Sequence, residues 1–267
     1  DGAVSAMIGV ALQESADLVV HHLTHDITPY NIFEGSYRLF QTVEYWPEGT
    51  TFVSVVDPGV GSKRRSVVAL TEKNQYIVTP DNGTLSFIKQ HVGIKAVREI
   101  SEVANRRANT EHSYTFHGRD VYAYTGAKLA SGHIPFEEVG PLLKVEDIVE
   151  IPTVATEVGS DFVKGAIDIL DVRFGSLWTS ITREEFYSLQ PAFGDRFEVT
   201  IFNNDMLVYQ NQVTYGKSFA DVRIGQPLIY INSLYRVGVA INQGSFAKAY
   251  NVGVGQNWHI EIKKIAS

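Results

Sequence analysis

The chain has 267 residues, of which 44% are hydrophobic and 20% are charged, so it is long enough to bury one large or two modest hydrophobic cores. Its formal net charge of −7 disfavours a nucleic-acid partner, which normally requires a basic patch, and favours a small-molecule ligand. The sequence contains no cysteine and no apolar run near the roughly 20 residues of a membrane-spanning helix. We therefore expect a soluble cytoplasmic protein without disulfides, a thiol nucleophile, a thiolate metal site or a membrane segment.

The first predicted element is a helix that begins almost at the first residue. Apolar side chains recur at helical spacing over residues 6–12. A helix that enters an α/β domain usually follows a strand and a loop, so we expect a first strand and part of a ligand site to precede Asp1.

The segments that follow alternate between the two kinds of secondary structure. The predicted elements are a strand over residues 18–22, a helix over 32–45, strands over 51–56 and 66–70, and a helix over 120–131. Such alternation is typical of a layered α/β domain.

The pattern changes after about residue 150, where short strand-like runs dominate. They cover residues 163–170, 197–202, 207–212, 228–231 and 236–241. The fold class is therefore predicted to be α/β, with an N-terminal layered domain over residues 1–150 and a smaller β-rich domain over 151–267.

The most informative motif is Val55-Val56-Asp57-Pro58-Gly59-Val60-Gly61-Ser62-Lys63-Arg64-Arg65. It places one carboxylate and two guanidinium groups around a glycine-containing turn. In open α/β sheets ligands bind at strand ends, and Asp57 follows a predicted strand. We reject a phosphate-binding loop because the G-x-x-x-x-G-K-[ST] pattern is absent. Adjacent arginines are more often solvated surface charges, but here the nearby Asp57 favours a chemical site.

A second motif, Tyr114-Thr115-Phe116-His117-Gly118-Arg119-Asp120, precedes a predicted helix. A lone histidine at such a place is more often a capping or packing residue than a catalytic one. Asp120 is equally well explained by its favourable interaction with the helix dipole. His21, His22 and His25 lie close together, but His21 and His22 point to opposite faces of a predicted strand, so we expect no metal site there.

Further candidates lie in the second half. Residues 167–179 place Asp171 at a strand end beside aromatic side chains, a pattern that suits a ligand with a cationic or polyhydroxy part and a flat ring. A β-turn with core aromatics explains these residues at least as well. Residues 232–235 and 242–245 are polar turns that flank a strand and offer hydrogen bonds, as polar turns do without any ligand.

Together these segments resemble the S-adenosyl-L-methionine hydroxide adenosyltransferase family, which is related to fluorinating and chlorinating enzymes that attack the same substrate. The resemblance covers nearly the whole chain. Its marks are Val56–Gly61 with Arg64, Thr79-Pro80-Asp81-Asn82-Gly83, Phe116–Asp120, Asp171 with Phe174-Gly175, and Asn232-Ser233.

The resemblance implies an N-terminal α/β domain, a C-terminal β-barrel domain and a homotrimer with the ligand between subunits. It implies hydrolysis of S-adenosyl-L-methionine to adenosine and L-methionine, with no cofactor. By the same resemblance, Asp57, Arg64 and His117 hold the attacking water.

The resemblance also implies a set of substrate-binding residues. Asp1 matches the second aspartate of the family's N-terminal motif. The others are Tyr30 and Phe116 near the ribose, Asp171 and Ser233 at the methionine end, and Phe174, Ser176, Phe219 and Gln243 on the adenine side. The chain departs from the halogenating relatives at Ser176, where they carry asparagine, and at Leu234, where they carry arginine.

The chemistry suits these residue types. Attack at the 5′ carbon expels neutral methionine from a sulfonium, so the difficulty lies in supplying an oriented oxygen nucleophile. Arg64 would stabilise developing hydroxide, while Asp57 and His117 would orient the water and accept its proton.

Three alternatives are weighed against hydrolysis. The Asp57 carboxylate would repel a halide by on the order of 4 kcal/mol at 4 Å, which disfavours a halogenase, and the halogenating relatives match a tyrosine there. A non-catalytic protein that binds S-adenosylmethionine or adenosine is a second alternative, although binding alone requires no water-holding residues. An enzyme of α/β-hydrolase type is disfavoured because no G-x-S-x-G motif is present.

Overall fold

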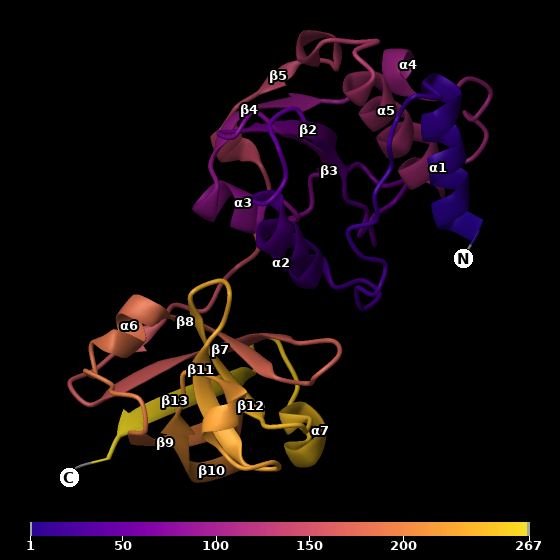
Figure 1. The fold of residues 1–267 in the computed structure, drawn as a ribbon. Helices are drawn as coiled ribbons and strands as arrows, with labels where there is room; N and C mark the ends of the chain where they lie inside the picture. Colours follow the sequence, from indigo (N-terminus) through magenta and orange to yellow (C-terminus); the bar gives the residue numbers. More distant parts are fainter. Residues whose placement is uncertain (1, 266–267) are drawn as a thin grey trace. The chain divides into compact units, whose positions relative to one another are not determined.

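The structure is a computed structural model that describes residues 2–265. The chain forms two compact units, the first ending at Ile151 and the second beginning at Pro152 (Figure 1). The first unit mixes helices with a sheet and the second is mostly strands, so the predicted α/β class is confirmed.

The first unit is built on a five-stranded sheet of order β1-β3-β2-β4-β5, in which β1 and β3 are parallel and the other neighbours antiparallel. Its strands are β1 (Thr51–Val53), β2 (Ser66–Thr71), β3 (Tyr76–Pro80), β4 (Ile94–Glu99) and β5 (Leu142–Leu143). Its α-helices are α1 (Gly2–Glu14), α2 (Ile32–Val43), α3 (Ser86–His91), α4 (Glu102–Asn105) and α5 (Tyr124–Ala130). A π-helix, η1 (Gly118–Ala123), runs directly into α5, and two short 3-10 helices are η2 (Phe136–Glu138) and η3 (Val145–Asp147).

Helices cover both faces of this sheet. On β2, successive side chains point to opposite faces, so Val67 and Val68 enter different cores. Val67 lies in a core with Leu39 of α2, while Val68 lies in a core with Val121 of η1 and Leu129 of α5. The result is the predicted layered arrangement, with η1 and α5 packed on the face opposite α2.

The strand predicted over residues 18–22 is wrong. These residues lie in the loop between α1 and α2, where Val19 is 79% exposed. A β-branched run becomes a strand only where a neighbouring strand pairs with its backbone, and this segment has no pairing among the described strands.

The strand predicted over residues 51–56 is shorter than expected, because β1 ends at Val53. Ser54 still donates its backbone N–H to Val78, but the carbonyl of Val56 accepts from the Asn82 side chain at 2.8 Å. A side chain thus replaces the sheet partner, and the chain leaves the sheet before it reaches Asp57.

The second unit is a closed barrel, which confirms the predicted C-terminal β-barrel. Seven strands pair in the cyclic order β7-β13-β9-β10-β11-β12-β8, and β6 adds to β7. The strands are β6 (Glu157–Val158), β7 (Phe162–Leu170), β8 (Leu177–Thr182), β9 (Arg196–Asn203), β10 (Met206–Tyr215), β11 (Pro227–Ile231), β12 (Arg236–Ile241) and β13 (Trp258–Lys264). The helices are α6 (Arg183–Tyr187), η4 (Phe219–Asp221) and α7 (Phe246–Tyr250).

The barrel closes around one apolar core. Val163 and Ile167 of β7, Ile181 of β8 and Phe197 of β9 are fully buried in it. Closure leaves the barrel strands without free edges. The loops that connect the strands are the parts of such a scaffold that usually carry functional residues.

None of the helices within residues 2–265 combines the length and the hydropathy that crossing a bilayer requires.

Candidate active site

Asp57 and Arg64 form a buried ion pair in the loop between β1 and β2. Arg64 Nε donates to Asp57 Oδ1 at 2.8 Å and Nη2 donates to Oδ2 at 2.5 Å. The two side chains are 9% and 5% exposed for Arg64 and Asp57. Two parallel charge-assisted hydrogen bonds fix the orientation of both groups, so this pair is a rigid feature and not a solvated surface contact.

The loop reaches this geometry through a glycine. Gly61 has φ +76°, and a Cβ on it would lie 2.9 Å from the carbonyl oxygen of Tyr114. Only glycine allows both the left-handed backbone and this close approach. The loop of Asp57 therefore packs against the segment that leads to His117.

His117 comes to the pair from 53 residues further along the chain. It precedes the π-helix η1 and is 3% exposed. Arg64 Nη2 lies 2.8 Å from His117 Nδ1, and since a guanidinium only donates, Nδ1 accepts. π-Helical turns are frequent at functional sites. The structure thus brings the three predicted water-holding residues together around Arg64.

Ser66 and Tyr122 complete the surroundings of Arg64, and sequence reasoning missed both. Arg64 Nη1 donates to Ser66 Oγ at 3.0 Å, and the Ser66 and Tyr122 hydroxyls lie 3.0 Å apart. The Arg64 guanidinium is 5.6 Å from the centre of the Tyr122 ring. The spacing Arg64-x-Ser66 at a strand start was the one available signal, whereas Tyr122 reads as an ordinary core aromatic.

The electrostatics of His117 favour the neutral imidazole. Burial lowers the pKa of His117, Glu102 raises it, Arg64 and Arg106 lower it, and Asp57 raises it. The net direction is downward from the usual value of 6.5. A neutral ring has the lone pair that the contact with Arg64 requires.

Arg65, the second arginine of the motif, has a structural role. Its Nε and Nη2 donate to Asp81 Oδ2 at 2.9 and 2.6 Å, and Nη2 also donates to the Asp147 carbonyl at 2.5 Å. Asp81 Oδ1 accepts from the backbone N–H of Val149. The arginine pair therefore divides: Arg64 faces Asp57, while Arg65 ties the end of β3 to the segment after η3.

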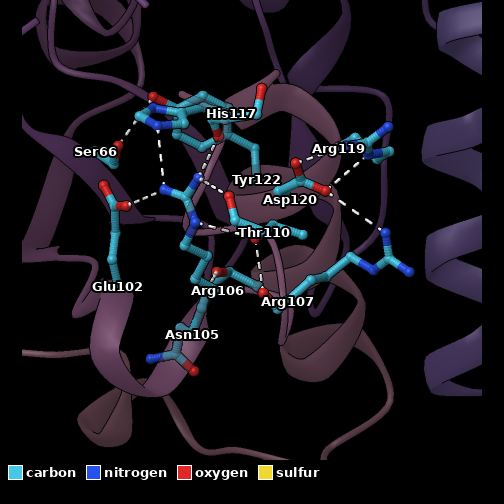
Figure 2. A network of polar contacts seen from close by, with 12 residues as sticks. Ser66, Glu102, Asn105, Arg106, Arg107, Thr110, His117, Arg119, Asp120 and Tyr122 are labelled. Atoms are coloured by element: carbon cyan, nitrogen blue, oxygen red, sulfur yellow. Dashed lines mark hydrogen bonds and ion pairs between the residues drawn. The ribbon is translucent and has the colours of Figure 1, made fainter. Parts of the chain in front are cut away.

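Asp120 also serves structure. Its carboxylate accepts from Arg119 at 2.7 and 2.8 Å and lies 3.6 Å from Arg107, and it is 1% exposed (Figure 2). Within residues 2–265, no group of three or more histidine, cysteine, aspartate or glutamate side chains is arranged to hold a metal ion.

Two of the expected ribose contacts lie in the first unit. Tyr30 precedes α2, is 79% exposed and has φ 68°. A bulky residue in this left-handed region is strained, and such strain concentrates at functional sites. Phe116 adjoins His117, with the Arg119 guanidinium 4.8 Å from its ring centre. Asp1, the remaining expected contact of this unit, lies outside the described residues.

The turn between β7 and β8 holds three of the expected contacts of the second unit. Asp171 Oδ1 accepts from the backbone N–H groups of Arg173 and Phe174 at 3.0 and 3.1 Å. These hydrogen bonds stabilise the turn, as expected from the alternative interpretation of these residues as a β-turn. It leaves Phe174 68% exposed and Ser176 buried.

The other expected contacts of this unit lie in three separate segments. The ring centres of Phe219 of η4 and Tyr230 are 5.1 Å apart, and Ser176 lowers the pKa of Tyr230 against the larger, raising effect of burial. Gln243, with φ 55°, follows β12, and Ser233 lies in the hairpin that precedes β12. The structure therefore clusters Phe219 with Ser176, and it places Gln243 and Ser233 at opposite ends of one strand.

Comparisons with known proteins agree over most of the chain. A family model for the SAM hydroxide adenosyltransferase N-terminal domain matches residues 1–140, and one for the C-terminal domain matches residues 165–259. An (R)-S-adenosyl-L-methionine hydrolase from Salinispora arenicola is 31% identical over 97% of this chain and 93% of its own. A fluorinase from Actinopolyspora mzabensis is 27% identical over 96% of this chain and 92% of its own. The crystal structure of an uncharacterized conserved protein from Thermotoga maritima has a TM-score of 0.90 and 29% identity, covering 99% of this chain and 96% of that chain.

Proposed function

The chain belongs to the SAM hydroxide adenosyltransferase family, and from this premise we propose that it hydrolyses S-adenosyl-L-methionine to adenosine and L-methionine. The observation that carries the proposal is the buried cluster of Asp57, Arg64 and His117. The hydrolase name of several relatives supports the same reaction.

The reaction is a displacement at the 5′ carbon of the substrate. The water oxygen forms a bond to that carbon, the carbon–sulfur bond breaks, and its electron pair stays on sulfur. The sulfonium becomes a neutral thioether, and the water loses one proton. No acid is needed for the leaving group, so the protein's task is to orient the water and stabilise the charge on its oxygen.

Arg64 is the group suited to stabilise that charge. Its position is set by Asp57, Ser66 and His117 together, so it does not have to move as negative charge develops on oxygen. Asp57 is the acceptor suited to orient the water and take its proton. The only lone pair of the neutral His117 ring is on Nδ1 and faces Arg64, so His117 acts by fixing Arg64. No step in this sequence requires a metal or an organic cofactor.

The Asp57 carboxylate also supports water over halide as the nucleophile. A buried carboxylate repels an anion and accepts hydrogen bonds from water. The Arg64 guanidinium offsets part of this repulsion, so the stronger distinction is that a water molecule can donate a hydrogen bond to the carboxylate and a halide cannot. This distinguishes hydrolysis from the reaction of the fluorinase relatives.

The family resemblance assigns substrate-binding residues to each of the two units. We assign the ribose to Tyr30 and Phe116, and we assign Asp1 to the substrate-binding residues through its match to the family's N-terminal motif. The adenine is assigned to Phe174, Ser176, Phe219 and Gln243, and the methionine end to Asp171 and Ser233. The separation of Gln243 and Ser233 by the length of β12 suits a ligand with two distant ends. A homotrimer with the substrate between subunits, and a cytoplasmic location, stay predictions.

The test is incubation of the protein with S-adenosyl-L-methionine in oxygen-18 water, with products followed by mass spectrometry. Adenosine labelled at the 5′ oxygen, together with methionine, is the expected result. Substrate binding without turnover would support the non-catalytic alternative instead. Adenosine that carries no label would exclude attack by water at the 5′ carbon.

A further inference from the structure

A second arginine, Arg106, lies at the other nitrogen of His117. Its Nη1 is 3.4 Å from His117 Nε2, while Arg64 Nη2 is 2.8 Å from Nδ1. Figure 2 shows Arg106 between Glu102 and the imidazole. The ring of His117 is thus placed between two guanidinium groups.

Arg106 is held firmly in this place. Its Nη1 donates to Glu102 Oε2 at 2.7 Å, Nε donates to Thr110 Oγ1 at 3.1 Å, and Nη2 donates to the carbonyls of Thr110 and Ser113 at 3.0 and 2.7 Å. The Tyr114 ring centre is 4.6 Å from the guanidinium carbon. Since the Arg106 side chain is only 6% exposed, it is not a solvated surface charge.

The two guanidinium groups restrict the protonation of His117. A guanidinium has donors only, and a neutral imidazole has one N–H and one acceptor. The shorter contact, with Arg64, assigns the acceptor to Nδ1 and the proton to Nε2. Arg106 therefore approaches Nε2 as one donor facing another, so it acts on the ring through its charge and not through a hydrogen bond. A second proton would create a positive ring between two cations, and this is unfavourable in a buried site.

The charges around the ring balance only when it is neutral. Asp57 neutralises Arg64 on one side, and Glu102 neutralises Arg106 on the other. These four groups are the charged residues that act on the His117 pKa: both arginines lower it and both carboxylates raise it. The uncharged rings of Tyr114 and Tyr122 pack against the imidazole.

We propose that Arg106, backed by Glu102, is a positioning residue that keeps His117 neutral, so that Nδ1 remains the acceptor that holds Arg64. The evidence for this charge arrangement is the set of contacts in the protein without substrate. Its consequence for turnover rests on the proposed hydrolysis.

The test is an NMR titration of the His117 imidazole in the free protein, with the signal assigned from its loss in His117→Gln. Arg106→Gln removes a positive neighbour and should raise the His117 pKa by about one pH unit. Glu102→Gln removes a negative neighbour and should lower it. Opposite shifts from two residues of one ion pair are not expected from a purely structural role.

Matched controls come from an exposed pair elsewhere in the first unit. Lys73 and Glu44 lie 3.2 Å apart and are 46% and 51% exposed. Lys73→Gln and Glu44→Gln make the same charge changes and should leave the His117 titration unchanged. If Arg106→Gln disorders the loop that Arg106 holds, Glu102→Gln still tests the proposal, because it leaves the other Arg106 contacts in place. An unchanged or raised His117 pKa in Glu102→Gln would overturn the proposal.

Kinetics then separate this proposal from the proposed function. The acid limb of kcat/KM should move with the NMR titration in each variant, and Arg106→Lys, which keeps the charge, should restore the wild-type titration. Shifted titrations with an unmoved acid limb would refute a role for His117 in turnover while supporting the charge arrangement. If the acid limb of kcat/KM moves while the NMR titration of His117 does not, the positioning role of Arg106 is refuted and the proposed hydrolysis still holds.

Discussion

Replacing Arg64 by lysine separates the charge of this residue from its geometry. The guanidinium makes four contacts: two with Asp57, one with Ser66 and one with His117. An ammonium keeps the positive charge but offers three donors from one atom, so it does not reproduce the planar fork.

The loss can be estimated from these contacts. Hydrogen bonds that involve a charged group contribute about 1.5 to 3 kcal/mol each, and lysine must lose at least one contact of the bidentate pair. A loss of about 3 kcal/mol in the transition state corresponds to a rate reduction of about 100-fold. We therefore expect kcat for adenosine formation to fall about 100-fold in Arg64→Lys.

The assay is the initial rate of adenosine formation at saturating S-adenosyl-L-methionine, with thermal melting as a check on folding. Arg65→Lys is the matched control, because Arg65 forms a similar ion pair but its partner is Asp81 and not Asp57. Arg65→Lys should lower the melting temperature with little change in kcat. A wild-type kcat in a folded Arg64→Lys variant would refute the reasoning.

Three further predictions concern stability. Because burial lowers the pKa of His117, the imidazole binds a proton more readily in the unfolded chain than in the folded one. The stability of the fold should therefore fall as the pH drops below about 6.5. His117→Gln should flatten this part of the plot of melting temperature against pH. Burial raises the pKa of the Asp168 carboxyl to about 7, so the protonated carboxyl stabilises the folded state fully below about pH 4, and this stability is lost as the pH rises to 7. In urea unfolding, Asp168→Asn should lack this decline in the free energy of unfolding. The same decline in both proteins would contradict the assignment. Gly61→Ala should cost about 1 to 3 kcal/mol in the free energy of unfolding, because its φ is positive and its Cβ would meet the Tyr114 carbonyl. Gly59→Ala is the control, since its nearest neighbour is the Ser62 hydroxyl at 3.3 Å, and equal losses in both variants would count against the argument.

Most strands of the second unit were predictable because their side chains alternate and they are bounded by turn residues. The run over residues 236–241 coincides with β12, and the run over 163–170 differs from β7 by one residue. Barrel closure was expected only through the family resemblance, since it depends on the pairing of β13 with both β7 and β9. Pairing between distant strands leaves no local mark on a sequence.

The residues of the candidate site were also only partly predictable from the sequence. Asp57, Arg64 and His117 stood in motifs, and the family resemblance joined them into one site. Ser66, Tyr122, Glu102 and Arg106 were not predicted. The former lie in glycine-containing turns that stand out locally. The latter lie in a strand, in a π-helix and at the two ends of a short α-helix, where their residue types are unremarkable.

By itself, the sequence determined the class of fold, the alternation of elements and the residue types available for chemistry, because periodicity and turn propensity are local properties of the chain. Only the tertiary structure decided the roles of Arg64 and Arg65, which are adjacent in sequence but face different carboxylates. It also decided the state of His117, since burial and the approach of two arginines lower its pKa. The physical reason is that desolvation and Coulomb interactions depend on distance in space, and folding brings together groups that are 53 residues apart.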